Sequence, residues 1–197
     1  MTNFEWLDCM RKEQKGLLQL ADALDHGISK PMFYEYVKTQ KMDKVGPGIY
    51  LSEDSWVDTM YLLHLRFKKA VFSHETALFL HDLSDREPTQ YALTVKTGYN
   101  PSRMKAEGIQ VFTVKEDLMR VGVTTLNTPF GNAVPVYDLE RTICDLIRSR
   151  SQMEMQTVQT ALKLYAARRD KNLRALMNYA KQFHVDNILR QYLGVLL

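Results

Sequence analysis

Three side chains of one short segment have the type and spacing needed to contact a nucleic-acid backbone. They are Lys30, Tyr34 and Lys38, at positions i, i + 4 and i + 8. In an α-helix this spacing places side chains on one face, and ammonium and phenol groups bind phosphate oxygens. Lys41 extends the basic character of the same segment. The segment therefore predicts a helix that presents cations to DNA.

The residues around this stripe predict the helix that positions it. Ser29 is a suitable N-cap, and Pro31 falls in the first turn, where its missing N–H costs nothing. Apolar residues recur at helical spacing on the opposite face. They are Phe33, Tyr36, Val37 and Met42. One side of the helix is thus expected to be buried and the other exposed.

Elements on either side complete a DNA-reading module. Residues 17–24 are expected to form a short amphipathic helix, which ends at the His-Gly pair of 26–27. Residues 43–45 and 49–51 are expected to pair as two short strands, because a Gly-Pro-Gly turn separates them. This is the layout of a winged helix-turn-helix.

The predicted DNA contacts come from the helix and the wing. They are Ser29, Lys30, Tyr34, Lys38, Lys41, Lys44 and Pro47. Residues 1–54 hold 7 Lys and Arg against 9 Asp and Glu, a net charge of −2. The prediction therefore rests on where the cations lie, since phosphate contacts need a local basic face. The alternative is a winged helix that binds protein and not DNA.

A second group of cations lies near the C-terminal end of the sequence. From residue 141 onward there are 10 Lys and Arg against 4 Asp and Glu, a net charge of +6. Four of these cations form a cluster, namely Arg168, Arg169, Lys171 and Arg174. Clustered cations steer association with an acidic partner or add contacts to DNA. A solvated helix surface explains the cluster equally well, so a partner or DNA patch and a plain surface both stay open.

Residues that would support catalysis or metal binding lack the partners that such chemistry requires. His74 and His81 are two helical turns apart, but no third ligand is spaced with them. Asp82 and Asp85 precede a strand that contains Lys96, as in a metal-dependent nuclease, yet no carboxylate stands just ahead of the lysine. A nuclease is therefore the weaker alternative. The sequence predicts no catalytic residue, no metal site and no cofactor.

Composition is that of a globular protein without a membrane segment. The 197 residues are 45% hydrophobic and 25% charged, with a net charge of +3. Glu5, Asp8 and Glu13 interrupt the first turns, which does not fit a secretory signal peptide. The longest uncharged run, 121–137, contains Thr, Asn, Gly and Pro and does not suit a spanning helix. We expect a cytoplasmic protein with no membrane partner.

The two cysteines, Cys9 and Cys144, have neither the spacing of a metal site nor that of a redox motif. Both lie in apolar helical patterns. We therefore expect both to be small core residues.

The remaining periodicities predict an α+β fold. Helices are expected over 3–14, 55–69, 74–81, 138–150, 152–168, 173–183 and 185–196, and strands over 91–97, 109–114, 121–127 and 133–137. Residues 71–72 are expected to be a short strand or an extended entry to the helix that follows. In the second of these helices Ser55 is the expected cap and Trp56 lies on the apolar face. We expect a winged helix-turn-helix domain over 1–54. A C-terminal domain over 55–197 is expected to hold a small mixed sheet and several packed helices, ending in a helical bundle.

Four stretches, in this order and spacing, resemble the AbiEi family, the antitoxins of bacterial abortive-infection toxin–antitoxin systems. They are GPGIY over 46–50, FSHETALFLHDLSDREP over 72–88, YALTVKT over 91–97 and VPVYDLERTICDLI over 134–147. The resemblance implies a transcriptional regulator in phage defence that binds inverted repeats in its own promoter DNA through the winged helix. It also implies that the C-terminal domain counteracts a cognate nucleotidyltransferase-like toxin.

The sequence departs from the family pattern in its recognition helix, which is aromatic at Phe33, Tyr34 and Tyr36 where arginines are common. Within the last of the four stretches, Arg141 and Asp145 are spaced i, i + 4 and form a pair on one helix face. Orientation of that helix and contact with a partner are both open explanations for the pair.

Overall fold

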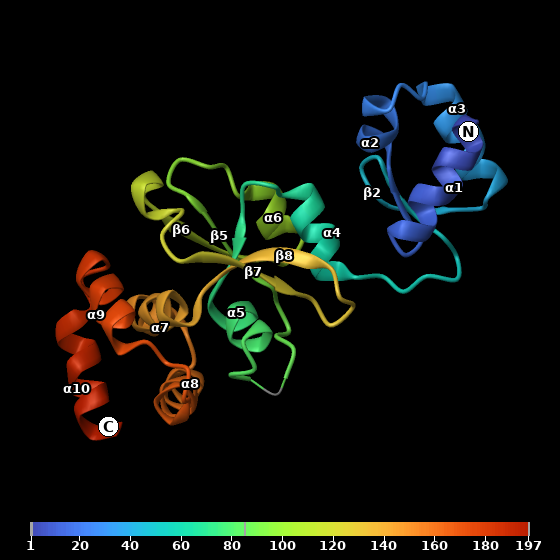
Figure 1. Ribbon diagram of the computed structural model, residues 1–197. Helices are drawn as coiled ribbons and strands as arrows, with labels where there is room; N and C mark the ends of the chain where they lie inside the picture. Colours follow the sequence, from blue (N-terminus) through green and yellow to red (C-terminus); the bar gives the residue numbers. More distant parts are fainter. Residues whose placement is uncertain (1, 85, 197) are drawn as a thin grey trace. The chain divides into compact units, whose positions relative to one another are not determined.

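The computed structural model describes residues 2–84 and 86–196, and the chain divides into two compact units, Met1–Arg66 and Phe67–Leu197. Each unit contains both helices and strands (Figure 1). The fold is α+β, with a three-stranded sheet in the first unit and a five-stranded mixed sheet in the second. This confirms the predicted fold class. Within the described part of the chain, no helix is long and apolar enough to cross a membrane.

The first unit begins with the element order of a winged helix. Its elements are α1 (Asn3–Glu13), β1 (Leu17–Gln19), α2 (Leu20–Asp25), α3 (Lys30–Thr39), β2 (Asp43–Gly46), β3 (Ile49–Leu51) and α4 (Thr59–Arg66). The strands pair antiparallel in the order β1-β3-β2. The helix after Ser29 and the β2-β3 hairpin agree with the sequence prediction. Met42 is buried as expected, but it lies beyond the end of α3.

β1 is a strand where the sequence predicts the start of a helix. Leu17 lies opposite Leu51 in the sheet, and Leu18 lies opposite Tyr50. Because neighbouring strand residues point to opposite faces, Leu18 joins the core of the three helices while Leu17 joins a cluster on the other face. A short helix would bury both leucines on one side. The predicted helix therefore starts only at Leu20.

The second face of this small sheet is covered by α4. Leu62 of the helix packs with Leu17, Ile49 and Leu51 of the sheet. The sheet is thus apolar on both faces, with the helical core on one side and α4 on the other. This packing places α4 in the first unit, which ends at Arg66 and not at the predicted residue 54.

α4 is also shorter than the helix predicted over 55–69. Its cap is Asp58, whose Oδ1 accepts the N–H of Tyr61 at 3.0 Å. Ser55 instead ends a turn, donating its N–H to the carbonyl oxygen of Ser52 at 3.0 Å. The Ser55 hydroxyl lies against Gly16, where an added Cβ would approach it to 1.9 Å. Trp56, predicted to pack on an apolar face, is 84% exposed.

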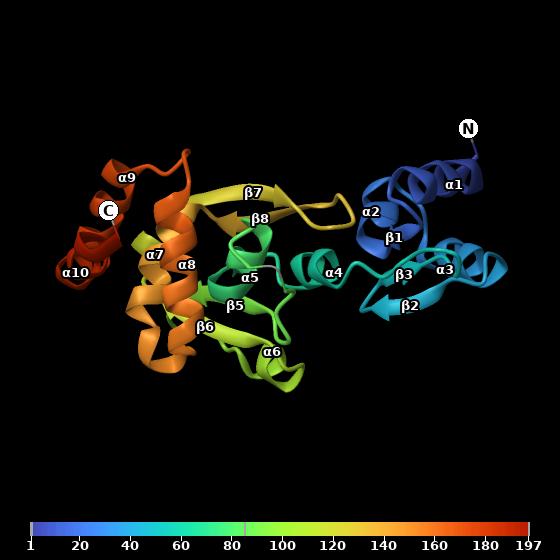
Figure 2. The ribbon, with the colours of Figure 1, turned by 90° about the horizontal axis from the view of Figure 1, so that it is seen from below.

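The second unit is built on a mixed sheet with the strand order β6-β5-β4-β8-β7. The strands are β4 (Val71–Phe72), β5 (Ala92–Lys96), β6 (Gln110–Val114), β7 (Val123–Asn127) and β8 (Ala133–Tyr137). β4 pairs parallel with β8 and β5 with β6, whereas the other two pairings are antiparallel. β5, β6, β7 and β8 lie within the segments expected to be strands, and β4 lies where a short strand or an extended entry is expected. β7 and β8 form a hairpin that is clear in Figure 2.

Helices of this unit pack with the sheet and with one another. They are α5 (His74–Leu80), α6 (Ser102–Ala106), α7 (Leu139–Arg148), α8 (Met155–Ala167), α9 (Leu173–Gln182) and α10 (Asp186–Leu196), with two short 3-10 turns over Glu116–Leu118 and Arg150–Gln152. Every residue of α7 from Leu139 to Ile147 is buried. α7 is therefore the central helix of the unit's core, contacting α5, α8, α9 and α10. α6 was not predicted.

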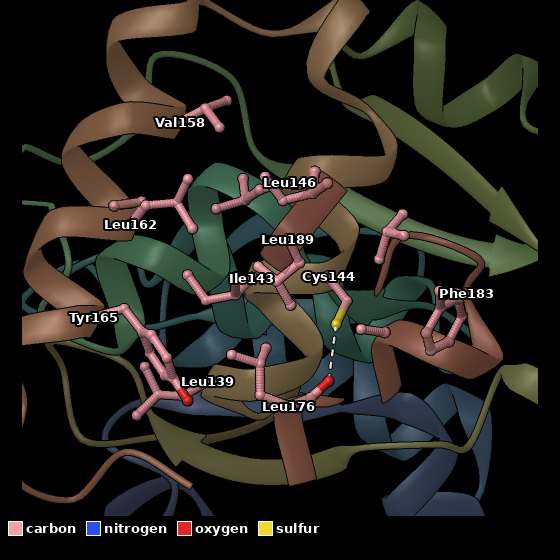
Figure 3. Close-up of a cluster of buried hydrophobic side chains, with 14 of the residues drawn as sticks. Leu139, Ile143, Cys144, Leu146, Val158, Leu162, Tyr165, Leu176, Phe183 and Leu189 are labelled. Atoms are coloured by element: carbon pink, nitrogen blue, oxygen red, sulfur yellow. Dashed lines mark hydrogen bonds between the residues drawn. The ribbon is translucent and has the colours of Figure 1, made fainter. Parts of the chain in front are cut away.

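The two cysteines have different environments. Cys144 of α7 is buried among leucine and isoleucine side chains, and its thiol points to the carbonyl oxygen of Leu176 at 3.7 Å (Figure 3). Burial raises the pKa of this thiol. Cys9 of α1 is exposed, so the core prediction is wrong for this residue. α1 buries little more than Leu7, because it covers only one side of a small core.

Candidate nucleic-acid interface

The predicted DNA-contacting stripe of α3 is exposed as a whole. Lys30, Tyr34 and Lys38 are all exposed, whereas Phe33 and Tyr36 on the other side of the helix are fully buried. Three cation or phenol groups at i, i + 4 and i + 8 therefore share one solvent-facing side of a helix whose opposite side is held in the core. The side chains are arranged as the sequence predicts.

Ser29 begins this helix without a capping bond from its side chain. Its backbone has the extended conformation of an N-cap, with φ −70° and ψ 151°, but its hydroxyl makes no capping hydrogen bond. The residue is exposed. Because N–H groups at a helix N-terminus and nearby hydroxyls bind anions, the first turn of α3 is suited to hold a phosphate group beside Lys30.

The wing is fixed to α3 by aromatic contacts. The Tyr50 ring of β3 lies 6.2 Å from the Tyr34 ring and 5.6 Å from the Phe33 ring, measured between centroids, and is steeply inclined to both. Burial, with a smaller effect of the Tyr34 phenol, raises the pKa of Tyr50. The phenol of Tyr50 is therefore neutral at physiological pH and adds no negative charge beside the cations.

Lys44 of β2 lies directly opposite Tyr50 in the antiparallel ladder. Residues that face each other in such a ladder point to the same side of the ribbon. Lys44 therefore projects on the side of the wing that contacts α3, while remaining exposed. It adds a cation next to the stripe from a second element.

The remaining predicted contacts lie at the two ends of the β2 strand. Pro47 is exposed in the turn of the hairpin, which Gly48 closes with φ +69°. Lys41 is exposed in the connection after α3, where it has φ +50°. A register irregularity between Lys44 and Gly46 bends the wing near its tip. All seven predicted DNA contacts are thus on the surface of the first unit.

The histidines considered for metal binding are committed to structural hydrogen bonds. His74 is buried and stacks on Phe112 with 3.4 Å between ring centroids. Its ring nitrogens lie 2.9 Å from the Ser73 hydroxyl and 3.0 Å from the Ser149 hydroxyl. Burial lowers the pKa of His74 well below its ordinary value, so the ring is neutral. The Ser73 hydroxyl in turn accepts the hydroxyl of Thr94 at 2.8 Å.

His81 lies past the end of α5, and not on a common helical face with His74. Its Nε2 is 2.7 Å from the carbonyl oxygen of Tyr137. Burial lowers the pKa of His81. Across residues 2–84 and 86–196, no group of three His, Cys, Asp or Glu side chains is placed to hold a metal ion.

The lysine considered for a nuclease site, Lys96, pairs with an acidic residue other than Asp82. Its ammonium pairs with Glu116 at 3.0 Å, from the segment that follows β6. Asp82 is exposed, in a left-handed conformation with φ +57°. Asp85 lies outside the described residues.

Arg141 is the largest fully buried side chain of the second unit. Its Nε donates to Asp145 Oδ2 at 2.9 Å, and its Nη1 donates to the carbonyl oxygens of Leu118 and Val121 at 2.9 and 2.8 Å. The guanidinium lies between two aromatic rings, 4.0 Å from the Tyr137 centroid and 3.9 Å from that of Phe183. The pair with Asp145 is therefore internal, and it holds a loop onto α7.

Other residues of the AbiEi-like stretches also bind within the second unit. Glu140 accepts the Tyr165 hydroxyl at 3.1 Å and the N–H of Asn172 at 2.7 Å, which connects α7 to α8 and to the start of α9. Thr76 accepts the N–H of Ala92 at 2.8 Å, which connects α5 to β5. Glu140 and Thr76 thus hold elements of the second unit together.

Half of the basic cluster near α9 is used within the chain. Arg168 forms two bonds of 2.8 Å to Asp170 and donates to the carbonyl oxygen of His81 at 2.9 Å. The hydrogen bonds from Arg168 lower the pKa of Asp170 to about 2. Lys171 donates to the carbonyl oxygen of Arg168 at 2.8 Å. Arg169 and Arg174 are exposed and make no such bonds among the described residues, so these two remain the candidates for a partner.

Comparison with known proteins gives a fold relationship. No protein-family profile matches the sequence. No curated protein matches it either. The structure is similar to a crystal structure of the RV2827C protein from Mycobacterium tuberculosis, with a TM-score of 0.62 over 88% of this chain and 69% of that chain. The two sequences are 9% identical, so the similarity concerns the fold alone.

Proposed function

We propose that the chain is a DNA-binding transcriptional regulator that contacts promoter DNA through α3 and the β2-β3 wing. The observation that supports this is the joint exposure of Lys30, Tyr34 and Lys38 on one side of α3, with Lys44 on the adjoining side of the wing. A helix of this kind enters the major groove while the neighbouring cations bind the backbone.

The charge of the first unit is consistent with a local interface. Met1–Arg66 holds 8 Lys and Arg against 10 Asp and Glu, a net charge of −2. DNA affinity must then come from a few placed phosphate contacts. Each such contact releases counterions, so log K should fall with log salt by about 0.9 per phosphate. A modest salt slope is expected.

The test is a titration of the full chain with a DNA duplex from upstream of its own gene. Binding is measured by fluorescence anisotropy at several salt concentrations. Lys38→Ala should weaken binding and reduce the salt slope by about one. Lys12→Ala is the matched control, because Lys12 is an exposed lysine of α1, outside the predicted interface. If both variants lose DNA affinity equally, or if neither loses affinity, α3 is not part of the interface.

We also propose, on the resemblance to AbiEi antitoxins, that the second unit counteracts a nucleotidyltransferase-like toxin. Arg169 and Arg174 are the exposed cations of the basic cluster and are suited to an acidic surface of such a partner. Co-expression of the full chain with the toxin tests this. Arg169→Glu/Arg174→Glu should lose protection while promoter binding is retained, and Lys105→Glu/Lys115→Glu, at two other exposed lysines, should keep both.

The alternative function is a winged helix that binds protein. A duplex titration in which no salt-dependent binding appears, together with full protection from the toxin, would favour it over the regulator.

A further inference from the structure

A cleft of about 580 Å³ lies within the second unit, and none of the predicted DNA contacts of α3 and the wing lines it. Residues of three strands line it, namely Val71 of β4, Lys96 of β5 and Val123 of β7. Its volume is within the range of small-molecule sites, about 300–1,000 Å³. The cleft is therefore large enough for a ligand the size of a nucleotide.

The cleft is bounded by a segment that crosses the sheet. Residues 115–122 leave β6 at one edge of the sheet and join β7 at the other. Glu116, Met119 and Arg120 of this crossing segment line the cleft. Val71 and Lys96 come from the same face of the sheet, because Val71 lies opposite Thr94 and Lys96 is two residues further along β5.

The crossing segment is held in place by hydrogen bonds from α7 and β8. Arg141 donates to its carbonyl oxygens at Leu118 and Val121, and the Tyr137 hydroxyl donates to that of Met119 at 3.0 Å. Gly122 closes it with φ +73°, where an added Cβ would lie 2.7 Å from the Cβ of Arg141. The backbone that carries Arg120 is thus pre-organised, which reduces the ordering cost of binding a ligand.

Four cations and one carboxylate line this cleft. The cations are Lys68, Lys69, Lys96 and Arg120, and all four are exposed. Glu116 is the carboxylate, and it pairs with Lys96 at 3.0 Å. Within the described residues the other three cations have no ion-pair partner. Three positive charges in excess within one concave site strongly favour an anionic ligand.

The cleft also has an apolar and aromatic lining. Tyr99 is half-buried there, and Met119, Val71 and Val123 complete the lining. A phosphate ion alone would use the cations and leave this surface unused. A nucleobase stacks on a phenol ring and packs against aliphatic side chains.

We propose that this cleft binds a free nucleoside triphosphate, with the phosphates held by Lys69, Lys96 and Arg120 and the base against Tyr99. The site is independent of the α3 interface and of the proposed regulator function. A duplex backbone fits it less well, because these cations surround a concavity whereas duplex phosphates lie on a convex surface. Binding of the triphosphate releases Lys96 from Glu116, so the carboxylate opposes binding.

The test is isothermal titration calorimetry of the full chain with ATP, GTP, CTP and UTP, and with inorganic tripolyphosphate. Lys96→Ala/Arg120→Ala should weaken the binding of triphosphate at least about tenfold, since each removes a charge-assisted bond. Lys105→Ala/Lys181→Ala removes the same charge from exposed positions outside the cleft and its crossing segment, and should change affinity less than about twofold.

Two further variants test the triphosphate part and the nucleoside part of the ligand separately. Glu116→Gln should raise the affinity for both ATP and tripolyphosphate by several-fold, because it removes the competing carboxylate. Tyr99→Leu should lower the affinity for the nucleoside triphosphates and leave that for tripolyphosphate unchanged. Circular dichroism and the melting temperature establish that each variant is folded.

Three results would overturn the proposal. One is that no nucleoside triphosphate binds at millimolar concentration. Another is that the cleft variant and its charge-matched control lose affinity equally. The third is that a short single-stranded oligonucleotide binds through the same cations and cannot be displaced by triphosphates, which would assign the site to a nucleic-acid strand. None of these outcomes depends on whether α3 binds promoter DNA.

Discussion

The ring of Tyr34 lies 6.2 Å from the ring of Tyr50 at an angle of 78°, so one residue of the exposed stripe is also the contact between α3 and the wing. Tyr34 is 45% exposed, and its other side faces solvent with Lys30 and Lys38. We predict that Tyr34→Ala weakens DNA binding partly through the wing. Its effect should then be non-additive with that of Lys44→Ala.

The measurement is a double-mutant cycle on the dissociation constant for promoter DNA. An aromatic contact of this kind is worth about 0.5–1.5 kcal/mol, which sets the expected size of the coupling. Glu35→Ala with Lys44→Ala is the control pair, since Glu35 is the exposed neighbour of Tyr34 in the helix. Simple additivity for Tyr34 and Lys44 would mean that the wing is positioned without this contact.

The buried ion pair of α7 gives a prediction about stability. Arg141→Met should lower the free energy of unfolding of the second unit by about 3–5 kcal/mol, because the fully buried carboxylate of Asp145 loses its closer, fully buried partner. Arg141→Met/Asp145→Leu should recover only part of this, since the carbonyl oxygens of Leu118 and Val121 still lack a donor.

Urea denaturation measured by circular dichroism tests this prediction. Arg148→Met is the control. Arg148 lies 3.6 Å from Asp145 but is 28% exposed, so this variant should lower the free energy of unfolding by less than about 1 kcal/mol. If Arg141→Met and Arg148→Met lose similar free energies of unfolding, Arg141 is not the main partner of the Asp145 carboxylate.

Gly122 and Gly98 form a matched pair for a test of the crossing segment. Both have positive φ, +73° and +89°, but an added Cβ meets Arg141 at 2.7 Å in the first case and no atom within 4 Å in the second. Gly98→Ala should cost about 1 kcal/mol through the backbone alone. Gly122→Ala should cost clearly more, because the segment must move away from α7. Thermal unfolding of the two variants is the measurement.

Acid should destabilise the second unit through the buried His74 and the half-buried His81. Burial lowers the pKa of both His74 and His81 below the ordinary value of 6.5. Below pH 6.5 the unfolded chain therefore binds protons that the folded chain does not. Stability is fully present above this pH and falls as the pH decreases, by up to about 1.4 kcal/mol per pH unit for each histidine.

His74→Asn should reduce this slope towards that of one histidine. Asparagine tolerates the left-handed backbone of this position, which has φ +49°. The free energy of unfolding is measured from pH 8 down to pH 5, and the comparison at pH 8 separates the loss of the Phe112 stacking from the proton effect. An unchanged slope in the variant would show that His74 does not contribute.

Local patterns in the sequence were sufficient for most elements. Pro31 and the apolar face of α3 predict the helix and its exposed stripe correctly, and alternation predicts β5, β6 and β7 of the second sheet. These features depend on residues close in sequence, where periodicity is informative. The Ser29 cap position also follows from local preference.

Features that depend on distant residues were missed. Leu17 and Leu18 fit a helical pattern, because no neighbouring residue indicates that their strand partners are Leu51 and Tyr50, far along the chain. The i, i + 4 spacing of Arg141 and Asp145 was visible, but their complete burial comes from Phe183 and the 118–121 loop. The cationic cleft was not predicted, since it combines residues of three strands with residues of the segments between them.

The apolar second face of the small sheet limits how the winged helix can be separated from the rest of the chain. A fragment that stops at residue 54 would leave Leu17, Ile49 and Leu51 uncovered, because Leu62 of α4 would be absent. An open apolar sheet face promotes self-association. We therefore expect that a functional fusion protein or truncated gene that contains the winged helix keeps the chain intact through Arg66.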